Sequence, residues 1–191
     1  MPKFKAVNGW FYNAQELEKL NGADGVAGTG LTAIQGAGVI QTVQIPLSAL
    51  AVTMTDATTA GSHGSKKVFT FPAGNIQVTG ATTDLTIARV GTALTATSAV
   101  VGSLGSVTVS TADATLTSTE ANIIPSTAAT LTSGAGVFDG NSTASVTLNG
   151  TVTPVDVYLN FATPDAGSTG NDALTVNGNI YITYVNLGDN V

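Results

Sequence analysis

The chain has 191 residues, 12 acidic and 6 basic side chains, one histidine, no cysteine, and only 9% charged residues. A chain of this length buries roughly 70% of the surface that it exposes when unfolded, so it can form a core without disulfides or metals. With no cysteine, the sequence excludes disulfides, thiolate nucleophiles, zinc ribbons and iron–sulfur sites, and its one imidazole cannot form a multi-histidine metal site.

The low charge content is more unusual than the net charge of −6, because ordinary globular domains carry about 25% charged residues. Threonine, alanine and glycine are abundant instead. Threonine favours strands, whereas glycine permits tight turns and close backbone approach. The composition therefore predicts a β-rich protein whose surface of hydroxyl and methyl groups suits contact with neighbouring subunits.

The charges are unevenly distributed along the chain. All six basic residues lie in residues 1–89, whereas residues 90–191 contain seven acidic residues and neither lysine nor arginine. This second part would repel phosphates, which argues against nucleic-acid binding through it. Its acidic residues either solvate loops or meet a basic partner surface.

The sequence also gives no sign of a membrane segment. The N-terminus lacks the long apolar run of a signal peptide, and no window approaches 18 uninterrupted apolar residues. We therefore expect a soluble protein that is not exported by that route and does not bind membranes.

The first 38 residues differ in character from the rest and predict an N-terminal arm (1–38) joined to a body (39–191). A capping pattern that begins at Asn13, with Glu16 three residues later and Gly22 as a stop, predicts a helix of about two turns. The glycine-rich stretch 22–38 predicts a flexible or extended connector.

The arm carries the candidate interface residues, which combine aromatic or aliphatic side chains with flanking lysines. They are Lys3, Phe4, Lys5, Trp10, Phe11, Tyr12, Leu17 and Leu20. Two interpretations are open for them: they fold back onto the body of the same chain, or they dock on a neighbouring subunit or another partner.

The body shows the period-two alternation of half-buried strands, most clearly in residues 155–161. One face of this strand carries Val155, Val157, Leu159 and Phe161, and the other, solvent-facing side carries Asp156, Tyr158 and Asn160. Near the C-terminus, residues 174–176 and 180–187 flank Asn177–Gly178, a pair typical of a two-residue hairpin turn. The second of these strands is apolar on both faces, which predicts a place in the middle of a sheet or under an interface. One short helical turn is predicted from Thr117, where Glu120 completes a capping box.

The pattern as a whole predicts an all-β body. About nine or ten short strands, with turn signals about every 8–12 residues, indicate a sandwich, a jelly roll or a barrel. A doubly wound α/β fold would need amphipathic helices between its strands, and the sequence contains no such helices.

We find no pattern that predicts catalysis or a cofactor. His63 is the one candidate base for a triad, but it lies in a small-residue segment that predicts a mobile surface loop, and Ala60 breaks the G-x-S-x-G pattern. The connector glycines lack the lysine of a phosphate-binding loop. Residues 165–172 offer oxygen ligands without EF-hand spacing, so they form either a turn-rich connector or a weak calcium site. We therefore predict no enzyme, no cofactor and no metal.

Four segments of the body carry a resemblance to a known family: ATTDLTIA (81–88), PSTAATLT (125–132), VDVYLNFATPDA (155–166) and LTVNGNIYITYVNLGD (174–189). They resemble small Thr/Ala-rich proteins of tailed bacteriophages, the capsid decoration or cement proteins. The likeness covers residues 45–190 and does not extend to the arm.

The resemblance implies a jelly-roll-like β-sandwich body. To this body the sequence itself adds the extended N-terminal arm that contains a short helix. The resemblance also implies a structural virion protein on the outer capsid surface, which clamps neighbouring subunits of the major capsid protein. Such a protein would be a homo-oligomer, with a trimer favoured over a dimer.

Two alternatives remain from the sequence. One is a head-fibre or tail-associated module that binds a receptor or glycan through the exposed loops 56–67 and 163–172. The other is a carbohydrate-active enzyme on a jelly roll, against which the lack of an acid/base constellation counts.

Overall fold

The structure is a computed structural model that describes residues 4–5, 11–12, 25–35, 40–57, 60–109 and 116–188. Strands make up nearly all of the regular structure in these ranges, and none of the described residues forms an α-helix. The prediction of an all-β fold is therefore confirmed.

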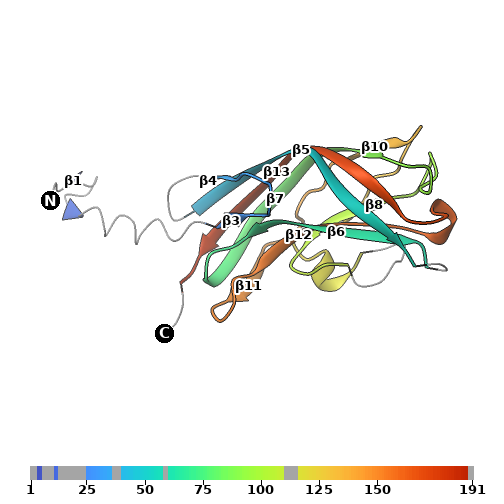
Figure 1. The fold of residues 1–191 in the computed structure, drawn as a ribbon. Helices are drawn as coiled ribbons and strands as arrows, with labels where there is room; N and C mark the ends of the chain where they lie inside the picture. The colour runs from blue at the N-terminus through green and yellow to red at the C-terminus, as the bar shows by residue number, and fades with distance from the viewer. Residues whose placement is uncertain are drawn as a thin grey trace.

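The body consists of two antiparallel sheets that curve toward each other (Figure 1). The strands of the first sheet are β5 (Ile40–Asp56), β13 (Asp172–Asn186), β7 (Gly74–Arg89), β10 (Ala135–Phe138) and β11 (Val146–Gly150). Those of the second sheet are β6 (Ser62–Thr70), β12 (Asp156–Thr163), β8 (Val101–Gly105) and β9 (Ile124–Ala128). The two sheets join where the end of β5 pairs with the start of β6, with Thr55 opposite His63.

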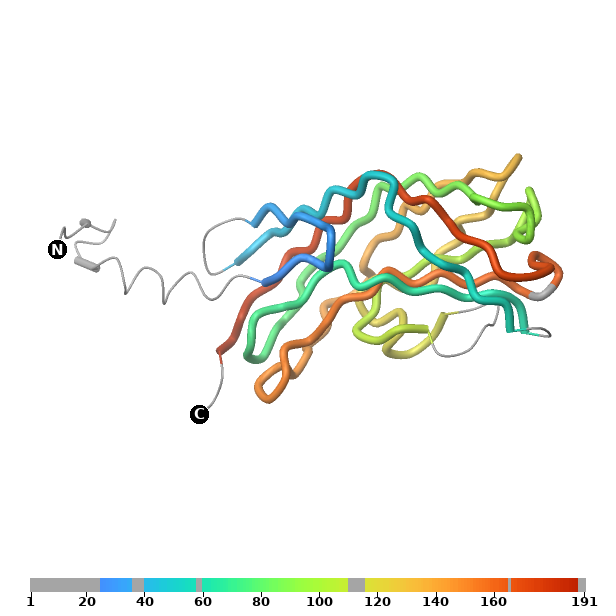
Figure 2. Tube along the Cα trace, viewed as in Figure 1, coloured from blue at the N-terminus to red at the C-terminus, as the bar shows by residue number. Residues whose placement is uncertain are grey.

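The order of the strands defines the topology. The first sheet runs β10-β7-β13-β5, with β11 also paired to β7, and the second runs β6-β12-β8-β9. Chain-adjacent strands thus lie mostly in opposite sheets, and the last two strands, β12 and β13, insert into the middle of the second and first sheets. This is the strand order of a jelly roll, and the path of the chain through the two sheets can be followed in Figure 2. The predicted jelly-roll-like sandwich is confirmed.

Strand β13 runs through the region where a hairpin turn was predicted. It pairs with β5 on one side and β7 on the other, with one register shift to β5 between Val176 and Gly178 and one to β7 between Thr183 and Tyr184. Gly178 has φ +124°, and a Cβ there would lie 2.1 Å from the Asp84 carbonyl oxygen. The Asn–Gly pair therefore lies within a continuous strand instead of a turn, because both neighbouring strands continue past it. The extra residue of the bulge is in β5, where Ala49 has φ +51°. The predicted place in the middle of a sheet is confirmed.

The strands of the first sheet are longer than the sequence pattern predicted. β5, β7 and β13 have 17, 16 and 15 residues. In β7 the apolar alternation is interrupted near Gly80, where the ladder to β13 shifts register between Thr183 and Tyr184. The glycine marks a bulge within one strand, not a boundary between two.

The interior of the sandwich contains two groups of aromatic rings. Phe69 lies in β6, and Phe71 follows the end of that strand. Their rings pack edge-on with centroids 5.4 Å apart, and the centroid of Phe71 also lies 5.0 Å from that of Tyr184 in β13. Phe138 of β10 and Phe161 of β12 form the second group, 5.9 Å apart. Each group joins the first sheet to the second, so these rings hold the two layers together.

We predict that Phe71→Ala lowers the free energy of unfolding by about 3–5 kcal/mol, because a fully buried ring is replaced by a cavity between the two sheets. Chemical denaturation followed by circular dichroism measures the change. Val152→Ala is the control, since Val152 is 94% exposed and its truncation should leave the unfolding midpoint in place. An unchanged midpoint for Phe71→Ala would contradict the packing described here.

Candidate interaction surfaces

The arm residues predicted as an interface lie only partly within the described ranges. β1 (Phe4–Lys5) and β2 (Phe11–Tyr12) pair antiparallel, with Phe4 opposite Tyr12 and Lys5 opposite Phe11. The other candidates, Lys3, Trp10, Leu17 and Leu20, fall outside the described residues, as does the helix predicted from Asn13 to Gly22. The backbone pairing brings two parts of the aromatic cluster together, a contact that the sequence reasoning missed.

The end of the predicted connector lies against the body. β3 (Val26–Ala27) pairs with β6, and β4 (Ile34–Gln35) pairs with β5. The Gln35 amide donates to the Gly25 carbonyl at 2.7 Å and accepts from the Gly25 N–H at 3.0 Å. A Cβ at Gly25 would lie 2.0 Å from the Phe69 ring, so only glycine permits this close approach. Residues 26–27 and 34–35 are thus paired with strands of the body, and a turn at residues 29–30 lies between them.

The solvent-facing side of the first sheet forms a broad surface that we call the outer face. Residues directly opposite each other in antiparallel strands share a face, so the pairing of β4, β5, β13 and β7 defines its members. They are Ile34, Ile40, Thr42, Gln44, Pro46, Asn179, Tyr181, Thr183, Val185, Gln77, Thr82, Asp84 and Thr86. Asp84 is the one charged residue among them.

Several polar groups of the outer face are hydrogen-bonded to one another. The Thr42 and Thr183 hydroxyls lie 3.1 Å apart across β5 and β13, and the Gln44 amide donates to the Asn179 side chain at 2.9 Å. Large apolar side chains stand exposed beside them: Ile34 at 61%, Ile40 at 63% and Tyr181 at 37%. The face therefore combines paired polar groups with uncovered apolar surface.

An open hollow of about 560 Å³ continues the outer face toward β10. Its lining is made of small and hydroxyl-bearing residues from β7, β10 and the segment before β10: Thr86, Thr130, Thr132, Ala135, Gly136 and Val137. Val137 lies opposite Thr86 and is 51% exposed. The hollow has the size of a small ligand pocket but carries no charged side chain, so it suits an apolar or hydroxyl-rich surface.

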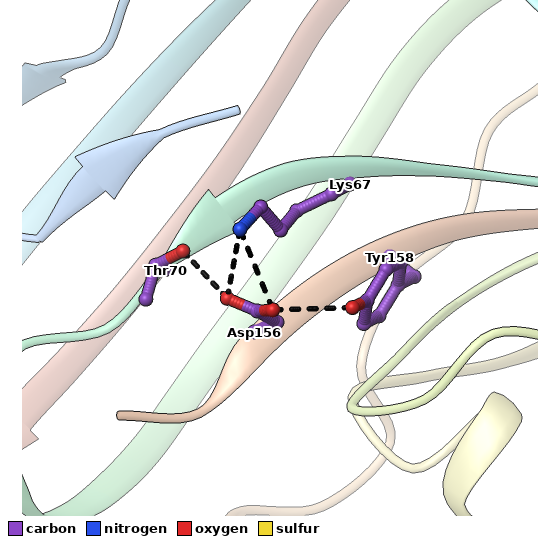
Figure 3. A network of polar contacts seen from close by, with 4 residues as sticks. All are labelled: Lys67, Thr70, Asp156 and Tyr158. Carbon is purple, nitrogen blue, oxygen red and sulfur yellow. Dashed lines mark hydrogen bonds and ion pairs between the residues drawn. The ribbon is translucent and has the colours of Figure 1, made fainter. Parts of the chain in front are cut away.

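The second sheet carries a charged cluster at the start of β12 (Figure 3). The Asp156 carboxylate accepts from the Thr70 hydroxyl at 2.6 Å and the Tyr158 hydroxyl at 3.1 Å, and the Lys67 ammonium lies 3.4 Å away. Partial burial alone would raise the pKa of Asp156, but these hydrogen bonds and the lysine charge outweigh it, so the pKa lies below 3.8. The pKa of Tyr158 is raised, by burial and by the neighbouring carboxylate.

The rest of that sheet's outer side is covered by the chain itself. Asn160 of β12 was predicted on a solvent-facing side, but it is fully buried, and its amide donates to the carbonyls of Val107 and Glu120 at 3.0 and 2.8 Å. The short turn predicted from Thr117 is present as the 3₁₀ helix η1 (Ser118–Glu120), without a side-chain cap from Thr117. This segment explains the burial of Asn160, which alternation alone could not reveal.

The oxygen-rich loop at 165–172 is tied to the protein backbone. The Asp172 carboxylate accepts from the N–H groups of Gly91, Leu94 and Ala173, at 2.7 to 2.8 Å. Burial would raise the pKa of Asp172, but these backbone hydrogen bonds lower it below 3.8. Asn171 likewise accepts from the Asp56 N–H at 2.8 Å. Both side chains thus hold neighbouring loops in place, which supports the interpretation as a connector.

His63 does not lie in a loop, because β6 begins at Ser62 and includes it. The sequence prediction was wrong here: the small residues around His63 pair with both β5 and β12, opposite Thr55 and Ala162. Its Nδ1 is buried and makes no hydrogen bond within the described residues. No triad geometry forms around it there, and in the same ranges no three acidic or histidine side chains converge as a metal-binding group.

No protein-family model matches the chain, and no curated protein matches it either. Within the described ranges, no helix is long and apolar enough to cross a membrane. The candidate surfaces are therefore interpreted from their own chemistry.

We predict that Asp172→Asn destabilises the fold by about 1–2 kcal/mol at neutral pH, because an amide cannot accept all the backbone N–H bonds that the carboxylate accepts. A carboxyl with a lowered folded-state pKa contributes stability that is fully present above its unfolded pKa of about 4 and is lost as the pH falls through the folded value. The difference between wild type and variant should therefore shrink below about pH 4.

Denaturation curves between pH 2 and pH 7 measure this difference. The control is Asp139→Asn, because Asp139 is exposed. It should follow the wild-type curve throughout, and the same behaviour in Asp172→Asn would show that the backbone bonds to Asp172 add nothing to stability.

Proposed function

We propose that this chain is a structural virion protein, a capsid decoration protein that binds the outer surface of a bacteriophage head and stabilises contacts between major capsid subunits. In this role it carries no catalytic residue, cofactor or metal. The observation that carries the proposal is a jelly-roll body with a broad, almost uncharged outer face.

The segments that resemble decoration proteins give the first line of support. Residues 81–88 lie in β7, 125–132 begin in β9, 155–166 contain β12, and 174–189 contain most of β13. β7 and β13 are neighbours in the first sheet and provide much of the outer face. Two of the four segments thus lie side by side in the first sheet, and the other two lie in the second sheet.

The fold gives a second line of support by analogy. Double-sheet jelly rolls are common among viral capsid and lectin domains. A fold does not by itself define a function, so the chemistry of the surfaces must decide between these uses. A lectin site needs convergent polar groups beside an aromatic platform, whereas Thr42, Thr183, Gln44 and Asn179 of the outer face are hydrogen-bonded in pairs.

The proposed mechanism is stabilisation by mass action. A protein that binds the assembled shell and not the separated subunits shifts the equilibrium toward the shell, and many equivalent sites multiply the effect. We propose that the arm supplies the attachment, because Trp10, Phe11 and Tyr12 are residue types that dominate binding energy in interfaces.

The proposal is tested by mixing the purified protein with undecorated capsids and sedimenting the particles. Co-pelleting at a saturable ratio is expected. A protein that stays in the supernatant but is retained on host-cell envelopes would instead favour the receptor-binding alternative.

We predict that deletion of residues 1–22 abolishes co-pelleting while the body stays folded. The deletion removes the aromatic arm but leaves β3, which pairs with β6. Circular dichroism of the truncated protein checks the fold, and unchanged co-pelleting would exclude the arm as the attachment.

We predict that Trp10→Ala weakens attachment by roughly 2 kcal/mol or more, as expected for a central aromatic anchor. A binding isotherm on undecorated capsids measures the effect. Trp10→Phe is the matched control, because it retains a ring and should lose much less affinity. An alanine variant that binds like wild type would show that Trp10 is not an anchor.

A further inference from the structure

The outer face is large enough to form a stable interface by itself. β13 has 15 residues, so at about 3.3 Å per residue it spans roughly 50 Å. The three long strands β5, β13 and β7, spaced by about 4.8 Å, give a width of roughly 14 Å and a footprint of about 700 Å². A standard interface buries about 600–1,000 Å² on each partner.

The chemistry of the outer face lowers the cost of covering it. The hydroxyls of Thr42 and Thr183 and the amides of Gln44 and Asn179 already have partners within the face. Covering the β5 and β13 part of the face therefore leaves few polar groups without a hydrogen bond, which is the main penalty of burial. Covering the whole face also removes the exposed side chains of Ile34, Ile40 and Tyr181 from water.

Charge determines which partner fits this face. Residues 25–188 contain eight acidic and three basic residues, so two copies of the body, each with a net negative charge, repel each other. The outer face is the exception, because Asp84 is its one charge. A basic partner would instead be drawn to the acidic surface elsewhere. The neutral face thus favours a partner with an equally neutral surface, and a second copy provides one.

The face is also complementary to itself. A threonine hydroxyl both donates and accepts, so two threonine-rich faces can hydrogen-bond to each other, which two carboxylate-rich faces cannot do. Two twisted sheets pack face to face at about 30° between their strand directions, a common arrangement in sandwiches. A contact of one patch with the same patch is two-fold.

We propose that two copies of this chain associate through their outer faces, β5, β13 and β7 of one packing on the same strands of the other. The contact is a two-fold dimer, in place of the trimer that the sequence favoured. The dimer does not rest on the proposed function, because it concerns the protein free in solution. Either proposal can be wrong while the other holds.

The test is the oligomeric state of the full chain, measured by sedimentation equilibrium over a range of concentrations. Wild type should show twice the 19.0 kDa mass of the chain. Thr82→Glu places a second carboxylate on the outer face beside Asp84, so the two copies would repel, and the dissociation constant should rise at least about tenfold. Thr119→Glu is the matched control, since Thr119 is also exposed but lies on η1 over the other sheet.

Each outcome decides the matter. A dimer that Thr82→Glu dissociates and Thr119→Glu does not would support the proposal, provided that circular dichroism shows both variants folded. A wild-type monomer, a trimer, or a dimer unaffected by Thr82→Glu would overturn it. Should Thr82→Glu not fold, Tyr181→Lys repeats the test from β13. A dimer that dissociates in Trp10→Ala but persists in Thr82→Glu would assign the contact to the arm and overturn the outer-face proposal.

Discussion

The fold depends on the double ladder of β13. This strand is hydrogen-bonded to β5 on one side and to β7 on the other over nearly its whole length. One face of it buries Leu174, Val176, Ile180, Ile182 and Tyr184, and the opposite face supplies the centre of the outer face. Because side chains alternate along a strand, the register that fills the core also fixes which residues reach the surface. The core and the candidate interface are therefore two consequences of one register.

The alternation of apolar and polar residues in the sequence predicted part of this arrangement. The run at 155–161 predicted which residues of β12 face the core, and the doubly apolar segment 180–187 predicted a strand in the middle of a sheet; both hold in the structure. The Asn177–Gly178 pair led to the wrong prediction of a turn, because its turn preference is a local property. The strand continues through the pair because β5 and β7 both continue beside it. Likewise, the small residues around His63 resemble a loop until β5 and β12 pair with them.

The candidate surfaces were less predictable than the fold, for a physical reason. Membership of the outer face depends on long-range pairing: Ile34 joins Tyr181 only because both lie beside Gln44 of β5. Composition indicated that a threonine-rich, charge-poor surface should exist, but not that it would gather on one sheet. The burial of Asn160 similarly depends on residues 53 and 40 positions away in sequence, through the carbonyls of Val107 and Glu120.

Several charged residues of the body are paired or hydrogen-bonded at positions outside the outer face. Asp156 and Lys67 pair on the second sheet, and Asp172 is held by backbone N–H groups at a loop, so these carboxylates satisfy local structure. Screening by salt weakens contacts between exposed charges but leaves apolar burial nearly unchanged. A protein that must hold to its neighbours through changes in ionic strength gains from attachment surfaces of hydroxyls, methyls and aromatic rings. The interface that we propose would account for the low charge of the outer face, while Asp156, Lys67 and Asp172 are occupied within the fold.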